Sequence, residues 1–293
     1  MKQEPNKRDV SLLAFRATLL TLVFLLGSWL ALQGVHPFEF LEDGYEATKT
    51  LAIEQTQTRP KLMGELVYQS AGVTNHAPEQ AYEGLTALQG WFAPGPEVRL
   101  IDMHGNIVHK WNVDFFKIWP DPVHIYPEEN VPKTRFHFHT QGLAVLPDGS
   151  IVVNVNNHGT AKLDKCGNVV WTVNRKTHHS ISRTADGGCW IPSSRDVRKV
   201  QEDLFLPKVT KEFLKKTLGR YENMLLLVDA NGEIQKEFSV LEALLNEEFE
   251  HHLYDMSKIK KSAPTQVNDI DIVTAPLAQK IDDVHEGDLL VSI

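Results

Sequence analysis

Two histidines, two amides and a carboxylate occupy comparable places in successive parts of this sequence. Neutral imidazole is a competent nucleophile and proton acceptor near pH 7, and its N–H group can stabilise developing negative charge. Amide and carboxylate side chains can hold the polar groups of a substrate. The candidate catalytic residues are therefore His179 and His139, and the candidate substrate-binding residues are Gln141, Asn268 and Asp269.

These candidates are found by counting back from Asp-Gly turns. Gln141 and His179 each precede such a turn by seven residues, and Asn268 opens a third, similar segment. If each segment begins with an innermost strand, side-chain alternation sends Gln141, His179 and Asn268 toward one central channel. His139 should point the same way, and His178 should point to the opposite side from His179.

The turns belong to two kinds of repeated hairpin. One pattern has Asp, two spacers and Gly before a β-branched residue; its copies begin at Asp102, Asp164 and Asp229, 62 and then 65 residues apart. Asp supports such a turn and Gly supplies positive φ. The other pattern is Asp148-Gly149 or Asp186-Gly187 between apolar runs, which predicts a tight hairpin.

Two hairpins make a four-stranded meander, which is one blade of a β-propeller. The predicted blades span Gly84–Trp111, Phe136–Val173 and His178–Phe238, and a fourth begins near Val267. The fold class is therefore all-β, a propeller with about three and a half blades present and about six when complete. Because the chain stops inside an expected strand, we expect it to be an N-terminal fragment. Each blade ends in an aromatic residue assigned to core packing: Trp111, Trp171 and Phe238.

Two helical insertions are expected between the strands. One is predicted over Pro207–Leu218, stopped by Gly219. The other covers Ser239–Tyr254 and opens with the capping box Ser239-Val240-Leu241-Glu242. Insertions of this kind commonly cover one face of a propeller and shape its site.

The N-terminal region predicts a membrane anchor. Residues 1–16 carry Lys2, Lys7, Arg8 and Arg16 and form a predicted cytoplasmic tail, and the uncharged residues 17–35 form a predicted signal-anchor. Residues 36–83 are a linker with a helix over Phe38–Gln57, and residues 84–293 form the propeller on the periplasmic side. A cleaved signal peptide is the alternative, and it exports the propeller too.

Composition narrows the classes of partner. The 293 residues include 38 acidic and 30 basic ones, so no general attraction to nucleic acid is expected. The two cysteines, Cys166 and Cys189, either pair in an oxidising compartment or remain free thiols. The oligomeric state is left open.

Several of these segments together resemble the arylsulfotransferase family. The resemblance covers about Tyr68 to Ile293 and depends on the order of the segments. They are Gly72-Val73-Thr74, Leu100–Gly105, Phe138–Leu143 with Pro147-Asp148-Gly149, Lys162–Asp164 with Gly167–Trp171, His178–Ile181 and Asn268–Ile270.

This resemblance implies an exported propeller enzyme that moves a sulfo group from an aryl sulfate donor to a phenolic acceptor. It implies no cofactor, no metal and no nucleotide sulfate. A channel histidine carries the group covalently, and other histidines and an arginine stabilise the sulfate oxygens and the leaving phenolate. We expect the nucleophilic histidine and that arginine beyond Ile293, so His179 and His139 would be supporting residues that contact sulfate. Arg183 and Arg195 could bind sulfate, but exposure to solvent is the plainer interpretation of both.

Other functions remain open at this stage. The pairs His137/His139, His178/His179 and His251/His252 suggest a metal-dependent propeller, although adjacent strand residues diverge and zinc needs three or four converging ligands. A quinone-dependent dehydrogenase shares the blade plan. A non-catalytic exported propeller that binds or assembles other molecules is the third alternative, and a His179 ring turned into the blade would favour it.

Overall fold

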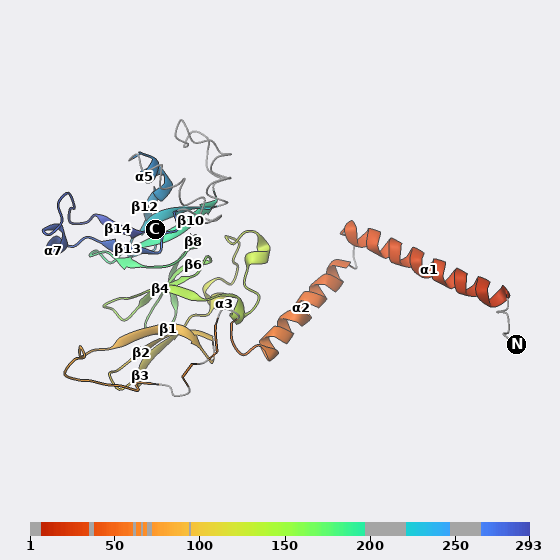
Figure 1. Cartoon of the computed structure of the whole chain (residues 1–293), viewed down its shortest axis with the longest axis horizontal. Coiled ribbons are helices and arrows are strands. Elements are labelled where there is room, and N and C mark those ends of the chain that lie inside the picture. Colours follow the sequence, from red (N-terminus) through yellow and green to blue (C-terminus); the bar gives the residue numbers. More distant parts are fainter. Residues whose placement is uncertain are drawn as a thin grey trace. The chain divides into compact units, whose positions relative to one another are not determined.

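A computed structural model of the chain describes residues 7–34, 38–60, 63–65, 67–68, 72–93, 95–196, 221–246 and 265–293. The chain divides into two compact units, Met1–Gln57 and Thr58–Ile293. Figure 1 shows the helices of the first unit and the sheets of the second.

The first unit consists of two helices, α1 (Lys7–Leu32) and α2 (Phe38–Thr56). Within α1, the segment Ser11–Leu32 has a mean hydropathy of 1.8 and its 22 residues are long enough to cross a membrane. The same composition is typical of a signal sequence near an N-terminus. The helix expected over Phe38–Gln57 corresponds to α2.

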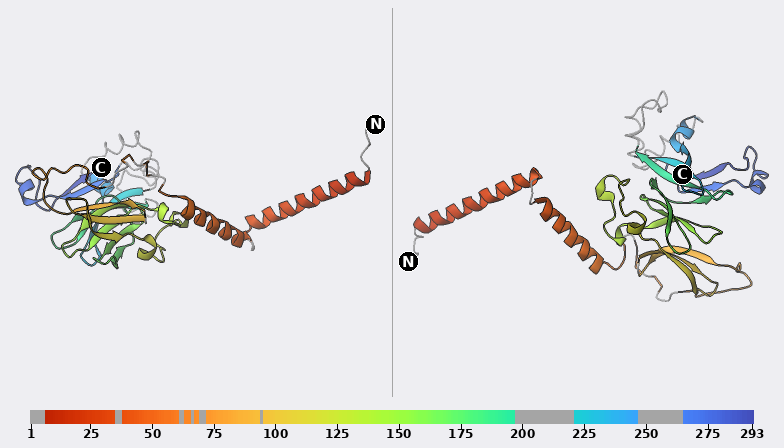
Figure 2. Two further views of the ribbon diagram at one scale, coloured as in Figure 1. Left: turned by 90° about the horizontal axis from the view of Figure 1, so that it is seen from below. Right: turned by 180° about the vertical axis from the view of Figure 1, so that it is seen from behind.

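The second unit is built from antiparallel sheets that follow one another along the chain (Figures 1 and 2). Sheet 1 contains β1 (Thr86–Phe92), β2 (Gly95–Ile101) and β3 (Ile107–Asn112). Sheet 2 contains β4 (Thr140–Val145), β5 (Ile151–Val155), β6 (Gly159–Leu163) and β7 (Val169–Val173).

Sheet 3 has a first strand that is interrupted. It contains β8 (Lys176–Thr177), β9 (Ser182–Arg183), β10 (Cys189–Asp196), β11 (Tyr221–Val228) and β12 (Ile234–Ser239). Both β8 and β9 pair with β10. Sheet 4 pairs β13 (Asp269–Ile272) with β14 (Leu289–Ser292).

Short helices lie between the strands. They are α3 (Phe115–Ile118), the 3₁₀ turns η1 (Glu128–Asn130) and η2 (Arg135–His137), α5 (Val240–Asn246) and α7 (Ala275–Ala278). The predicted cap of the second insertion is confirmed, since Ser239 Oγ accepts a hydrogen bond from the Glu242 N–H at 3.1 Å. The predicted helix Pro207–Leu218 and the end of the predicted Ser239–Tyr254 helix lie outside the described residues.

The repeated Asp-x-x-Gly turn is confirmed in all three copies. In the second copy, Asp164 Oδ1 accepts hydrogen bonds from the N–H groups of Cys166 and Asn168, both at 2.8 Å. A hydrogen bond from the Asn168 side chain is the largest cause of the lowered pKa of Asp164. The turn glycines have φ near +85°, at Gly105 (83°), Gly167 (81°) and Gly232 (88°).

Alternation along the strands builds a separate core between each pair of neighbouring sheets. On β5, Ile151 and Val153 pack toward sheet 1 with Trp111, whereas Val152 packs toward sheet 3 with Ile191. On β11, Leu225 instead joins the core shared with sheet 4. Each inner sheet therefore has two buried faces, as stacked sheets require.

Tryptophans also join the sheets by hydrogen bonds. Trp111 Nε1 donates to the Asp164 carbonyl at 3.1 Å, and Trp171 Nε1 donates to the Ala230 carbonyl at 3.0 Å. Each acceptor lies in the Asp-x-x-Gly turn of the following sheet. The third member of the predicted series differs: Phe238 is 49% exposed and stacks on Trp190. Its assignment to the core was wrong, because its ring packs on Trp190, a side chain that is itself only partly buried.

Sheet 1 also departs from the expected four-stranded pattern. It has three strands among the described residues, because no second Asp-Gly hairpin precedes β1. Sheet 4 is two-stranded there, and residues 273–288, including α7, replace a tight hairpin between its strands.

Candidate functional site

The first strands of sheets 2, 3 and 4 are linked by side chains. Gln141 Oε1, on β4, accepts a hydrogen bond from the His179 N–H at 2.7 Å. Ser180 Oγ accepts one from the Ile270 N–H, on β13, at 3.0 Å. Gln141 therefore meets the backbone of His179 at the break between β8 and β9, whereas the Asn268 side chain contacts the Gln266 carbonyl. The convergence of the three side chains on a central channel stays a prediction.

The loop in this break, His178–Ile181, is held by buried groups of sheet 2. Asn154 is 0% exposed, and its Nδ2 lies 2.9–3.2 Å from the carbonyl oxygens of residues 178, 179 and 180. Gly142 makes room for the loop, since a Cβ there would lie 2.1 Å from the His179 carbonyl oxygen. The Gln-Gly pair of β4 therefore positions the loop, through the Gln141 amide and the missing side chain of Gly142.

His178 and His179 form a contacting pair. Their Nδ1 atoms are 2.9 Å apart, and the rings meet edge to face with centroids 5.0 Å apart. The prediction that they point to opposite sides was wrong. His179 has φ of +54°, which interrupts the strand, so strand alternation does not apply there.

Burial favours the neutral form of both imidazoles of this pair. His178 is 5% exposed, and its burial, followed by the nearby His179, lowers its pKa from 6.5 to about 4. Partial burial also lowers the pKa of His179. At its other ring nitrogen, His178 Nε2 contacts Ser194 Oγ, on β10, at 3.1 Å.

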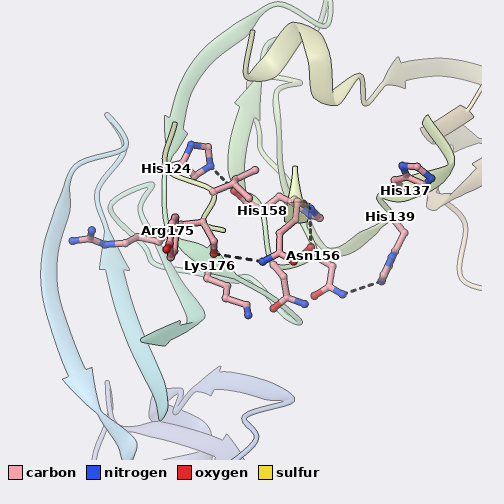
Figure 3. Close-up of a pocket in the computed structure, with 11 residues that line it drawn as sticks. His124, His137, His139, Asn156, His158, Arg175 and Lys176 are labelled. Carbon is pink, nitrogen blue, oxygen red and sulfur yellow. Dashed lines mark hydrogen bonds between the residues drawn. The ribbon is translucent and has the colours of Figure 1, made fainter. Parts of the chain in front are cut away.

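His139 lines a cavity of about 420 Å³ at the start of β4 (Figure 3). Asn156 Nδ2 donates to His139 Nε2 at 3.0 Å, which leaves the proton of the neutral ring on Nδ1. Partial burial lowers the pKa of His139. The lining residues are His124, Ile125, Tyr126, Asn130, His137, His139, Asn156, Asn157, His158, Arg175 and Lys176.

Two further imidazoles of this cavity make backbone contacts. His124 Nε2 lies 2.7 Å from the His158 carbonyl oxygen, and His158 Nδ1 lies 2.6 Å from the Asn156 carbonyl oxygen. Burial is the largest cause of the lowered pKa of His158. His124 Nδ1 and Asn156 Oδ1 are buried without a hydrogen-bond partner, so the wall offers polar atoms to a ligand.

A second cavity, of about 350 Å³, shares Arg175 and Lys176 with the first and is also lined by Ser194 and Arg195. The Arg195 guanidinium lies 2.6 Å from Glu222 Oε1, so a buried carboxylate offsets its charge. Arg183 lines a different cavity, with Asp271, and donates to the Val145 carbonyl at 2.8 Å.

Asn268 and Asp269 are exposed next to Ile270. Asn268 Nδ2 contacts the Gln266 carbonyl at 3.4 Å, and Asp269 Oδ1 accepts from the Ile270 N–H at 3.0 Å. The structure places both beside the Ser180–Ile270 link, with local backbone partners.

Several lining residues were missed by sequence reasoning. Asn156 and Ser194 stand 38 residues apart, the same interval as Asp148 and Asp186. Asn156 contacts His139, just before β4, and Ser194 contacts His178, in the break between β8 and β9. The repeat could have revealed this correspondence. His124 and His158 carry no repeat signal.

Among the described residues, no group of three or more His, Cys, Asp or Glu side chains is arranged to hold a metal ion. The site instead combines imidazoles, of which His139 and His158 have pKa values lowered by burial, with the side chains of Arg175 and Lys176. The Arg175 guanidinium also pairs with Glu237 Oε1 at 3.1 Å. Such a set can bind an oxyanion and move protons. The second unit is therefore mostly β, a series of stacked antiparallel meanders with a histidine-rich candidate site near their first strands.

The comparison with protein families identifies the class. Residues 142–293 match the model described as arylsulfotransferase (ASST), and the chain belongs to this family. The matched region includes the His178–His179 pair and begins just after Gln141. No curated protein matches the chain.

Two solved structures are similar over part of the chain. A protein of unknown function from Bacteroides caccae is 11% identical, with a TM-score of 0.30, and the match covers 53% of this chain and 39% of that one. BamB from Moraxella catarrhalis is 9% identical, with a TM-score of 0.24, covering 53% of this chain and 47% of that one. The chain thus matches less than half of the length of either protein.

Proposed function

We propose that this protein transfers a sulfo group from an aryl sulfate to a phenol, at a site formed where the first strands of its sheets meet. Membership in the arylsulfotransferase family is the observation that carries this proposal. The histidine pair and the cavity lined by four histidines, Arg175 and Lys176 support it. We further propose that the sheets are blades of a propeller with about six blades.

The reaction has two balanced steps. An imidazole nitrogen forms a bond to sulfur as the bond between sulfur and the phenolic oxygen of the donor breaks, and a proton neutralises the departing phenolate. The oxygen of a second phenol then forms a bond to this sulfur as the bond between sulfur and the imidazole nitrogen breaks; the phenol loses its proton, and the imidazole is restored. Dividing the transfer into two steps lowers each barrier.

We assign His139 and His179 to contact with the substrate. In the neutral tautomer set by Asn156, His139 has an Nδ1–H group that can donate to a sulfate oxygen. His179 keeps Nε2 outside the contact with His178. The positive charges of Arg175 and Lys176 favour binding of the sulfate group.

The test uses the full-length protein in detergent, with p-nitrophenyl sulfate as donor and phenol as acceptor. His179→Ala should lower the transfer rate by about 10²–10³, which is typical of losing a group that stabilises transition-state charge. The matched control is His104→Ala, because His104 is exposed in a turn of sheet 1. Wild-type protein without transfer to any phenol would overturn the proposal and favour a binding module.

We also propose that residues 17–35 anchor the protein in a membrane, that residues 1–16 are cytoplasmic, and that residues 84–293 lie on the periplasmic side beyond a linker over residues 36–83. The apolar helix α1 and the basic residues ahead of it support this topology. N-terminal sequencing of the mature protein is the test: a start near Val35 would identify a cleaved signal peptide instead.

A further inference from the structure

Three side chains of sheet 3 form a continuous chain of contacts from the loop His178–Ile181 to a cavity. His179 Nδ1 contacts His178 Nδ1 at 2.9 Å, and His178 Nε2 contacts Ser194 Oγ at 3.1 Å. Ser194 lines the cavity of about 350 Å³. We propose that Ser194, His178 and His179 form a proton relay in which His179 is the base for the phenolic acceptor; this role rests on the proposed function.

The chemistry of imidazole restricts the relay to two hydrogen-bonding arrangements. A neutral ring has one N–H donor and one bare nitrogen acceptor. In the first arrangement, His179 Nδ1–H donates to His178 Nδ1, and His178 Nε2–H donates to Ser194 Oγ. In the second, the Ser194 hydroxyl donates to His178 Nε2, and His178 Nδ1–H donates to His179 Nδ1.

The two arrangements differ at the substrate end. In the first, His179 Nε2 has a free lone pair and can accept a proton. In the second, His179 Nε2 carries a proton and can donate it. The contacts among these three side chains are satisfied in both arrangements, so the direction of the chain can reverse without breaking them. The Ser193 backbone and the Asn223 side chain also interact with the His178 ring and favour its protonated form.

This reversal balances the proton transfer of the second step. As the phenolic oxygen forms its bond to sulfur, the phenolic proton moves to His179 Nε2. The Nδ1 proton of His179 passes to His178 Nδ1, the Nε2 proton of His178 passes to Ser194 Oγ, and the original hydroxyl proton leaves to water in the cavity. The reverse sequence protonates the phenolate that leaves in the first step.

The groups around His178 and His179 favour a proton relay over a purely structural contact between the two rings. The backbone of His179 is fixed by Gln141 and Asn154, and this keeps the His179 ring in contact with the His178 ring. Burial makes a lasting imidazolium at His178 unfavourable, as its pKa of about 4 indicates, and the relay never needs one if the protons move together. The nearby charge of Lys176 acts in the same direction.

The relay is tested by paired serine variants. Ser194→Ala removes the outer member, whereas Ser193→Ala changes the adjacent residue, whose Oγ donates to the Lys176 carbonyl at 3.3 Å. General-base assistance matters most for weakly acidic phenols and contributes about 10²–10⁴ in rate. We expect Ser194→Ala and His178→Gln to slow transfer to unsubstituted phenol about tenfold or more, with much less effect on an acidic nitrophenol acceptor.

The initial burst of p-nitrophenolate from the donor should remain in both variants, because p-nitrophenolate is a good leaving group and needs little proton assistance. Melting temperatures of the three variants identify any loss that is merely structural. Equal effects of Ser193→Ala and Ser194→Ala, or a loss independent of acceptor acidity, would overturn the relay.

A second measurement does not depend on activity. In the full-length protein with ¹⁵N-labelled histidine rings, nuclear magnetic resonance at pH 8 should show scalar coupling between the Nδ1 atoms of His178 and His179. The coupling should vanish in His178→Gln and persist in Ser193→Ala. Its absence from the wild type would overturn the relay. Its presence in a protein without sulfotransferase activity would support the hydrogen-bonded chain and reject the proposed function.

Discussion

Asn154→Ala should destabilise the second unit and displace the His178–Ile181 loop. The substitution removes the donor that lies 2.9–3.2 Å from three carbonyl oxygens, and it removes an acceptor of the Thr160 hydroxyl group. Thr160 keeps a partner, because its Oγ1 also lies 2.8 Å from Thr177 Oγ1. The principal loss is therefore at the loop carbonyls.

The magnitude follows from burial. Leaving a buried polar group without its partner costs about 1–3 kcal/mol, and the Asn154 side chain is 0% exposed. With a small cavity in addition, we expect a loss of about 2–3 kcal/mol in the free energy of unfolding. For a unit of this size, that loss lowers the melting temperature by roughly 4–12 °C.

The assay is thermal unfolding followed by circular dichroism, with Asn168→Ala as the matched control. Asn168 is exposed in a turn and its Nδ2 donates to Asp164 Oδ2 at 2.9 Å, so its loss should stay within about 0.5 kcal/mol. Equal melting temperatures for Asn154→Ala and the wild type would refute the argument that Asn154 holds the loop.

Three further changes test other parts of the structure. In urea unfolding, Gly232→Ala should lower the free energy of unfolding by about 1–3 kcal/mol more than Gly167→Ala. Both glycines have positive φ, but only at Gly232 would a Cβ lie 2.7 Å from the Trp171 ring. The free energy of unfolding should fall as the pH is lowered from 6.5 toward 4, by up to about 3 kcal/mol from His178 alone. The reason is that His178 becomes protonated in this pH range in the unfolded state, whereas the buried ring stays neutral until about pH 4. His178→Gln should flatten this part of the pH profile. Iodoacetamide should alkylate Cys166 in the native protein and spare Cys189, whose burial raises its pKa to about 12, and peptide mass spectrometry showing early labelling of Cys189 would contradict the fold at β10.

The sequence was sufficient where structure is local or repeated. Asp102, Asp164 and Asp229 form the predicted turns because their side chains bond to backbone within a few residues. Counting from these hairpins also selected Gln141 and His179, and the structure shows that the Gln141 side chain contacts the His179 backbone. The family resemblance stated from the ordered segments is confirmed by the match over residues 142–293.

Features that depend on contacts between sheets could not be predicted from the sequence in the same way. The orientation of His178 could not be predicted from alternation, because the left-handed conformation of His179 is stabilised by Gln141 and Asn154, which lie on another sheet. His124 reaches the cavity from a connection that has no periodicity. Neither feature has a local sequence signal.

The tryptophan hydrogen bonds between sheets affect how further sheets could be added to such a protein by duplication. Sheet 2 supplies Trp171 as a donor to the following sheet and, in its Asp164 turn, the acceptor for the preceding one. A duplicated copy of sheet 2 would therefore carry both the tryptophan donor and the carbonyl acceptor of this hydrogen bond. The copy could be inserted without changes to either neighbouring sheet. Sheet 3 has Phe238 in the position of the tryptophan donor, where it stacks on Trp190, and a phenyl ring has no N–H group to donate. A copy of sheet 3 would therefore need a different contact with the sheet that follows it.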